Sequence, residues 1–115
     1  MTGKLVVLVT CATARQASRI AQTLVGERLA ACVNIQQSPV RSVFRWQGKV
    51  ERASEILLLA KTSARLFPRL ERRVRELHSY QTPEIVALPI AAGSQAYLQW
   101  LDESLALQKR ARPEK

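Results

Sequence analysis

The chain is 115 residues long and carries a formal net charge of +9 at pH 7, with 18 lysines and arginines against 9 aspartates and glutamates. This length fits one domain, and a hydrophobic content of 47% is enough for a packed core, which excludes a disordered chain. The longest apolar runs are far shorter than the ~20 residues of a membrane span, and the first is too short for the core of a signal peptide. We therefore expect a cytoplasmic protein with one domain over residues 1–108 and a basic, disordered tail over 109–115.

The excess of positive charge is uneven along the chain. Residues 1–62 carry a net +6, residues 63–108 are neutral overall, and residues 109–115 carry +3. A basic composition favours nucleic acid as a partner, because phosphate contacts dominate affinity of that kind. No strand combines aromatic with basic residues in the pattern of an RNA-binding sheet, so the preferred interpretation of the charge is solubility. Nucleic acid is accordingly not expected as a partner.

The first third of the chain predicts a strand, a helix and a second strand. Leu5–Val9 is a continuous aliphatic run, typical of a strand that is buried on both faces. Thr13, followed three residues later by Gln16, is typical of a capping box. It begins a helix over residues 14–28, in which apolar residues recur at helical spacing. The second strand follows over residues 31–36.

The middle of the chain predicts a long hairpin. Residues 42–46 alternate in the manner of a half-buried strand, and Gln47-Gly48 supplies a turn. Residues 50–61 then return as a long strand with apolar side chains on both faces. Phe44 and Trp46 share one face of the outgoing strand, and we expect them to pack at a subunit contact near the tip.

The last third predicts two helices around a short strand. Ser63 caps a helix whose apolar stripe ends at Leu77, and Pro68 stands in its first turn, where losing an amide hydrogen costs least. Residues 83–90 form a strand bracketed by prolines, which suits a sheet edge. Gly93-Ser94 opens the last helix.

This order of elements predicts an α+β fold. Helical crossovers on either side of a hairpin are typical of a ferredoxin-like sandwich, in which helices cover one face of an antiparallel sheet. Because the strands are apolar on both faces, the second face needs a cover from outside the chain. A second copy of the chain is the simplest cover, so we expect self-association.

The sequence shows no pattern of catalysis. It has one histidine, no Ser-His-Asp or Cys-His arrangement, and neither a GxGxxG motif nor a phosphate-binding P-loop. We therefore expect no enzymatic activity.

The densest cluster of polar residues lies at 76–85, between a helix and a strand, where ligands often bind. His78 offers an imidazole and Glu84 a carboxylate oxygen to a borderline metal such as copper(II). The alternative is that His78 only complements the dipole at the end of the helix.

Two cysteines and one histidine are too few ligands for a structural zinc site. Cys32 lies inside an apolar run, so we expect it in the core. Cys11 ends an apolar strand and is the thiol expected to be exposed, which makes it the better candidate for a metal ligand.

Several segments of the chain resemble the CutA divalent-cation tolerance family. In chain order they are Leu29–Ile35, Ser42–Glu51, Leu58–Thr62, His78–Ile85 and Tyr97–Leu101. The fourth is similar to the family's His-Pro-Tyr-x-x-Pro-Glu-Ile signature. Together the segments cover roughly residues 5–105 in order and at the right separations, so the resemblance is specific.

The resemblance implies a fold like that of the PII signalling proteins and a homotrimer whose sheets pack around a three-fold axis. It also implies a link to tolerance of copper and other divalent metals, through binding of a metal ion or a small effector, with no established reaction. The likeness to PII proteins further implies clefts between subunits that suit an anionic effector. The residues expected to line them are Lys61, Tyr80 and Arg45.

The chain departs from the family at the metal ligands. Ser79 replaces the usual proline after His78, and Leu77 stands where some members carry a second histidine. A thiol proposed as a copper ligand in some members lies where this chain has Val9. Cys11 is two positions further on, which keeps the same face of a strand and allows it to substitute.

Two other classes of protein are alternatives. A small hydrolase such as an acylphosphatase shares the topology, but it needs a phosphate-cradling loop after the first strand. The segment Thr10–Thr13 contains no glycine there, which argues against a hydrolase. A basic nucleic-acid-binding protein is supported by the net charge alone.

Overall fold

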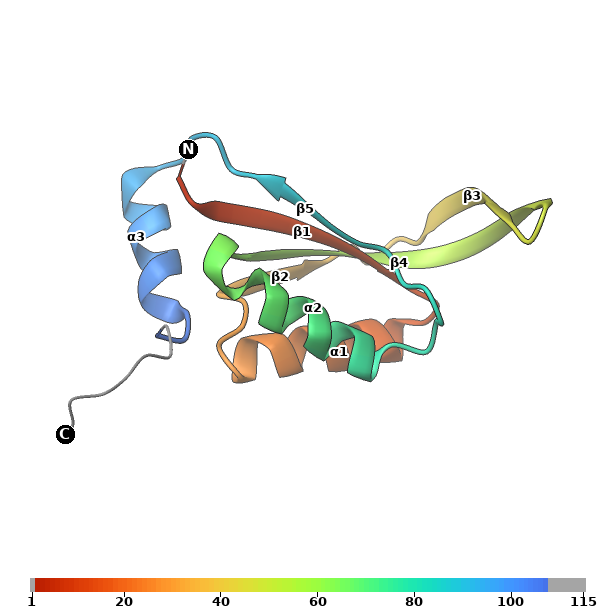
Figure 1. Ribbon diagram of the computed structural model, residues 1–115, viewed down its shortest axis with the longest axis horizontal. Helices are drawn as coiled ribbons and strands as arrows, with labels where there is room; N and C mark the ends of the chain where they lie inside the picture. Colours follow the sequence, from red (N-terminus) through yellow and green to blue (C-terminus); the bar gives the residue numbers. More distant parts are fainter. Residues whose placement is uncertain (1, 108–115) are drawn as a thin grey trace.

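The computed structural model describes residues 2–107, and the tail predicted over 109–115 lies outside the described residues. Strands and helices follow one another along the chain in the order that the sequence predicts (Figure 1). The elements are β1 (Lys4–Cys11), α1 (Ala14–Gly26), β2 (Cys32–Ile35), β3 (Val40–Trp46), β4 (Lys49–Ser63), the 3-10 turn η1 (Ala64–Leu66), α2 (Phe67–Leu77), β5 (Ile85–Pro89) and α3 (Gln95–Ser104).

The strands form one antiparallel sheet in the order β2-β4-β1-β5, and β3 pairs with the outer half of β4. This confirms the expected α+β, ferredoxin-like sandwich. β4 is 15 residues long, so its second half lies inside the sheet while its first half extends with β3 as a hairpin. Figure 1 shows that hairpin projecting well beyond the two helices.

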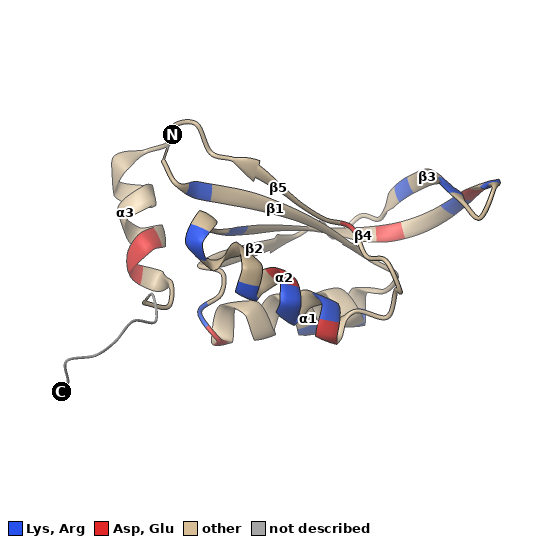
Figure 2. Ribbon diagram, viewed as in Figure 1, with Lys and Arg blue, Asp and Glu red and all other residues tan. Residues whose placement is uncertain are grey.

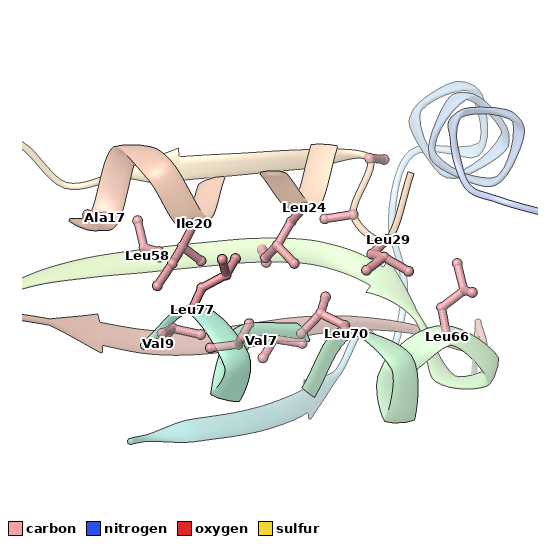
Figure 3. Packing of buried hydrophobic residues seen from close by; sticks show 14 of the residues in the cluster. Val7, Val9, Ala17, Ile20, Leu24, Leu29, Leu58, Leu66, Leu70 and Leu77 are labelled. Carbon is pink, nitrogen blue, oxygen red and sulfur yellow. The ribbon is translucent and has the colours of Figure 1, made fainter. Parts of the chain in front are cut away.

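Both α1 and α2 pack on the same face of the sheet. Thr13 caps α1 as predicted, because its hydroxyl oxygen accepts a hydrogen bond from the Gln16 amide at 3.1 Å. The apolar stripes of the two helices close over alternate residues of the central strands (Figure 3). Fully buried side chains in this layer include Val7, Val9, Ile20, Leu24, Leu58, Leu70 and Val74.

The opposite face of the sheet is apolar as well. The register places Leu8 between Leu59 of β4 and Val86 of β5, and it places Leu88 opposite Val6. Neither α1 nor α2 covers these side chains, and Val86 and Leu88 are about half exposed. We call the apolar side chains on this side of the sheet the open face. They are Val6, Leu8, Leu57, Leu59, Val86 and Leu88. The two-faced apolar strands inferred from the sequence are therefore present, and the helices α1 and α2 cover one of their faces.

Most elements begin or end one or two residues away from the predicted bounds, and two differences at the helices have a local cause. α1 ends at Gly26, because Arg28 takes a positive φ of 60° that a helix does not tolerate. Ser63 does not cap α2 as predicted: it is the last residue of β4, it makes no side-chain capping hydrogen bond, and α2 starts only after the turn η1. Pro68 sits at the first helical positions of α2, as expected. Within the described residues, no helix combines the length and apolarity of a membrane span.

Candidate functional site

A cleft lies where the projecting hairpin meets the loop between α2 and β5. Its volume is about 910 Å³. Its lining includes Phe44 and Trp46 of β3, the loop 79–84 and the buried Glu55 of β4. We call it the hairpin cleft. It gathers polar and aromatic side chains from four separate segments, which makes it the leading candidate for a site.

Glu55 is the buried charge of this cleft, with only 7% of its surface exposed. Ser42 donates a hydrogen bond to its Oε1 at 2.5 Å, and the hydroxyl of Tyr80 donates to its Oε2 at 2.8 Å. Each carboxylate oxygen therefore has its own donor, which is the condition under which a buried charge is tolerated.

Tyr80 is held in its neutral form by the same contact. Burial of the phenol, followed by its hydrogen bond to the Glu55 carboxylate and the repulsion from that charge, raises the pKa of Tyr80 to about 12. At neutral pH the hydroxyl is therefore protonated and remains a donor. Its ring also lies against the imidazole of His78, with ring centroids 4.8 Å apart.

His78 ends α2 and ties three segments together. Its Nδ1 accepts a hydrogen bond from the Tyr80 amide at 3.1 Å, and its Nε2 lies 2.7 Å from the Thr10 carbonyl oxygen. Because a carbonyl oxygen can only accept, the proton of the neutral ring sits on Nε2. Both ring nitrogens therefore already have partners within the chain, and a metal ion at either one would displace a hydrogen bond.

Cys11 is fully buried, so the expectation of an exposed thiol is wrong. It shares its face of β1 with Val7 and Val9, and that is the face that the helices cover. Burial, followed by repulsion from the Glu55 carboxylate, raises the pKa of Cys11 to about 11. The thiol is therefore protonated at neutral pH, whereas a metal binds the thiolate.

Cys32 also differs from its prediction, because it is half-buried rather than in the core. It stands opposite Lys61 in the β2–β4 register. Glu84 lines the hairpin cleft and is exposed. Among residues 2–107, no group of three or more histidine, cysteine, aspartate or glutamate side chains is arranged to hold a metal ion.

The three residues expected in the effector cleft do not meet within one chain. Tyr80 lines the hairpin cleft. Lys61 lies six residues beyond Glu55 along β4, about 20 Å at the rise of a strand, and bonds to the side chain of Asn34. Arg45 is exposed and pairs with Val50 near the hairpin tip. The implied cleft lies between subunits, so this arrangement stays a prediction.

The sequence reasoning missed Glu55, Ser42 and Thr10 as members of the polar network. One signal was available for Glu55, an acidic residue directly before the apolar run 56–60. An isolated charge at the start of a buried strand needs a partner, which predicts a polar contact without identifying it. The contact of His78 with the carbonyl oxygen of Thr10 could not be predicted in this way, because any residue offers a backbone carbonyl.

The fold and its cleft define a class: a small ferredoxin-like α+β protein with an open apolar sheet face and a projecting hairpin. The sequence model described as "CutA1 divalent ion tolerance protein" matches residues 5–104. The chain belongs to that family, as its resemblance predicted.

Individual relatives agree with this assignment. The Divalent-cation tolerance protein CutA of Thermus thermophilus is 54% identical over 99 residues, which cover 86% of this chain and 95% of that protein. Protein CutA of Homo sapiens is 43% identical over 81% of this chain, which spans only about half (51%) of the human protein.

Solved structures give the same answer for the fold. The Cut A1 protein of Thermus thermophilus superposes with a TM-score of 0.87 at 51% identity, covering 90% of this chain and 99% of that one. CutA1 of Oryza sativa superposes with a TM-score of 0.88 at 39% identity, covering 94% of this chain and all of that one.

The relatives differ in the compartment that their names give. The CutA structure from Archaeoglobus fulgidus, 40% identical over 88% of this chain and 97% of that one (TM-score 0.84), is described as periplasmic. A relative from Arabidopsis thaliana, 44% identical over 87% of this chain and 54% of its own length, is described as chloroplastic. Family membership therefore does not assign a compartment.

Proposed function

We propose that this protein acts as a cytoplasmic homotrimer in divalent-cation tolerance, binding a metal ion or a small effector without catalysing a reaction. Membership of the CutA1 family over residues 5–104 is the observation that carries the role in cation tolerance. The open face supports the assembly, because six aliphatic side chains on one sheet face form a surface that soluble monomers rarely leave in water.

Assembly also explains the projecting hairpin. Phe44 and Trp46 are 41% and 43% exposed, beyond the layer that the helices cover. Aromatic side chains are enriched at the centres of protein interfaces, where their large area is removed from water. Both residues are the anchors that we propose for the contact between subunits.

The assembly is tested by sedimentation equilibrium at micromolar concentration, which we expect to give three times the mass of the chain. A Leu8→Lys variant places a charge at the centre of the open face, and we expect it to shift the protein towards monomers. A matched Gln22→Lys variant adds the same charge on an exposed position of α1 and serves as the control. A monomeric wild-type protein would remove the physical basis of the proposal.

We propose copper(II) as the first metal to test and His78 as its first ligand, with Glu84 and Cys11 as accessory ligands. An imidazole nitrogen is the preferred donor for copper(II) in this set. The metal must displace one of the hydrogen bonds of His78, a loss of about 1 kcal/mol, and Cys11 must lose its proton. A site of this kind is weak unless subunits pool their ligands.

The metal site is tested by calorimetric titration of copper(II) into the wild-type protein and a His78→Gln variant. We expect the variant to lose most of the affinity, and acid to release the metal from the wild type because protons compete for the imidazole. A Gln81→Ala variant, changed in the same loop, is the control. Unchanged affinity in His78→Gln would exclude His78 as a ligand.

A further inference from the structure

The two helices that cover the sheet carry an excess of arginine on their outer side. Residues 14–28 and 64–77 contain eight arginines, three glutamates and no lysine. Figure 2 shows basic positions along α2 and at the ends of this layer. Part of the net charge of +9 is therefore concentrated on one layer of the fold. A general aid to solubility does not require such clustering.

Four of these arginines are already engaged within the chain. Arg73 contacts Glu27 at 3.0 Å and Glu76 at 3.1 Å, and Arg75 contacts Glu71 at 3.2 Å. These pairs occupy all three glutamates of the layer. The other two engaged arginines bond to backbone carbonyl oxygens; they are Arg28 with Ser104 and Arg65 with Ala106.

The remaining four arginines are exposed, and within residues 2–107 they make no hydrogen bond or ion pair. We call them the arginine face; they are Arg15, Arg19, Arg69 and Arg72. No carboxylate of the layer is left to neutralise them.

The helical geometry directs this face away from the core. Arg15 and Arg19 are one turn apart on α1, on the side opposite to the buried Ile20 and Leu24. On α2, Arg72 lies two residues after the buried Leu70, a rotation of about 200° around the helix.

The face extends along the whole helix layer. The helices run antiparallel, since Gln16 at the start of α1 contacts Ser79 after α2, while Glu27 after α1 contacts Arg73. Arg15 and Arg19 lie near the start of α1, whereas Arg69 and Arg72, near the start of α2, lie towards the other end of α1, so the four positions extend along most of a helix that spans about 20 Å.

We propose that the arginine face binds the phosphate backbone of duplex nucleic acid without sequence preference. Guanidinium groups present forked donors that match phosphate oxygens, and they remain charged at every physiological pH. Duplex DNA carries one charge per ~1.7 Å of its axis, so a length of about 20 Å holds roughly a dozen phosphates, and the arginine face meets those on its own side of the duplex. Contacts with the phosphate backbone do not need aromatic side chains for base stacking. The absence of a strand that combines aromatic and basic residues therefore argues against recognition of bases, but not against binding of the backbone.

A lipid surface fits the same face less well. Peripheral membrane helices combine basic residues with large apolar side chains that enter the headgroup region. Among the described residues of α1 and α2, the exposed large hydrophobic is Val25, near the end of α1. Exposed apolar area lies instead on the open face, the hairpin and α3, so burial of that area against further copies leaves the arginine face in solvent.

The experiment measures binding of the full chain to a fluorescently labelled 25-base-pair duplex by anisotropy, between 50 and 200 mM salt. The test variant is R15Q/R19Q/R69Q/R72Q. The control variant is K109Q/R110Q/R112Q/K115Q, which also removes four positive charges, but from the end of the chain. Sedimentation and thermal unfolding verify that both variants keep the assembly and the fold of the wild type. A second test variant, R15K/R19K/R69K/R72K, keeps the charge and removes the forked donors.

We expect the arginine-face variant to bind at least tenfold more weakly than the control variant at 50 mM salt. Its slope of log affinity against log salt is expected to fall by about 0.9 for each phosphate that the variant no longer neutralises. The affinity of the lysine variant should lie between those of the arginine-face variant and the control variant. Three results would overturn the proposal: no binding by the wild type at 50 mM salt, equal weakening in the glutamine variant and the control, or binding to vesicles rich in phosphatidylserine with none to the duplex.

Discussion

The two faces of the sheet are built from the same strands but are completed in different ways. On the covered face, Val7, Val9 and Leu58 are fully buried under α1 and α2, so the chain provides its own core. On the open face, side chains of the same type lie one residue away and remain partly exposed. The period of two along a strand therefore divides one apolar sequence into a folding surface and an assembly surface.

The first prediction compares neighbouring leucines of β4, one on each face. Leu58→Ala should lower the free energy of unfolding by about 2–5 kcal/mol, because it leaves a cavity in a fully buried site. Leu59→Ala removes the same atoms from the half-buried open face and should cost the fold less. Guanidinium unfolding at one fixed protein concentration measures both variants, since assembly couples stability to concentration.

Sedimentation of the same pair over a dilution series completes the comparison. We expect Leu59→Ala to weaken the assembly more than Leu58→Ala weakens it, after allowance for any unfolded protein. Equal effects of the two variants on both measurements would show that the two faces do not have separate roles.

The second prediction concerns the hairpin. Trp46→Ala should weaken the assembly by about 2 kcal/mol, because truncation of an aromatic anchor at an interface commonly has that cost. Val25→Ala is the control, since Val25 is equally exposed (42%) but lies on the helix layer. Dissociation on dilution measures both. A Trp46→Ala protein that dissociates at the same concentration as the wild type would remove the hairpin from the interface.

The order of elements could be predicted from the sequence because it depends on local patterns. Helical spacing, the Thr13 cap and the Gln47-Gly48 turn each act over a few residues, and each lies where it was expected. The ends of α1 and β4 were harder to predict, because a positive φ at Arg28 and an extended Ser63 leave little trace in the pattern.

The candidate site could be predicted only in part, because its contacts join residues that are distant in the chain. The alternation of β1 places Cys11 with Val7 and Val9, but only the tertiary fold decides that helices cover that face. Glu55 meets Tyr80 across 25 positions, and His78 meets Thr10 across 68. No local rule predicts such pairs from a single sequence.

The last prediction tests the polar network at the base of the hairpin, where the smallest effect is expected. Tyr80→Phe removes the donor to Glu55 and should lower the free energy of unfolding at pH 8 by about 1 kcal/mol. The pKa of Tyr80 is about 12 in the folded protein, above the ordinary value of about 10 for an unfolded chain. The stabilisation is therefore complete below pH 10 and is lost as the pH rises from 10 towards 12.

The raised pKa of Cys11, about 11, produces a similar loss at alkaline pH, but both proteins share it. The difference between wild type and Tyr80→Phe therefore isolates the tyrosine. Unfolding by guanidinium at intervals from pH 8 to 11.5 should show the wild-type advantage shrinking above pH 10 as the phenolate forms beside the Glu55 carboxylate. An advantage that stays constant over this range would mean that the Tyr80 hydroxyl does not donate to Glu55 in solution.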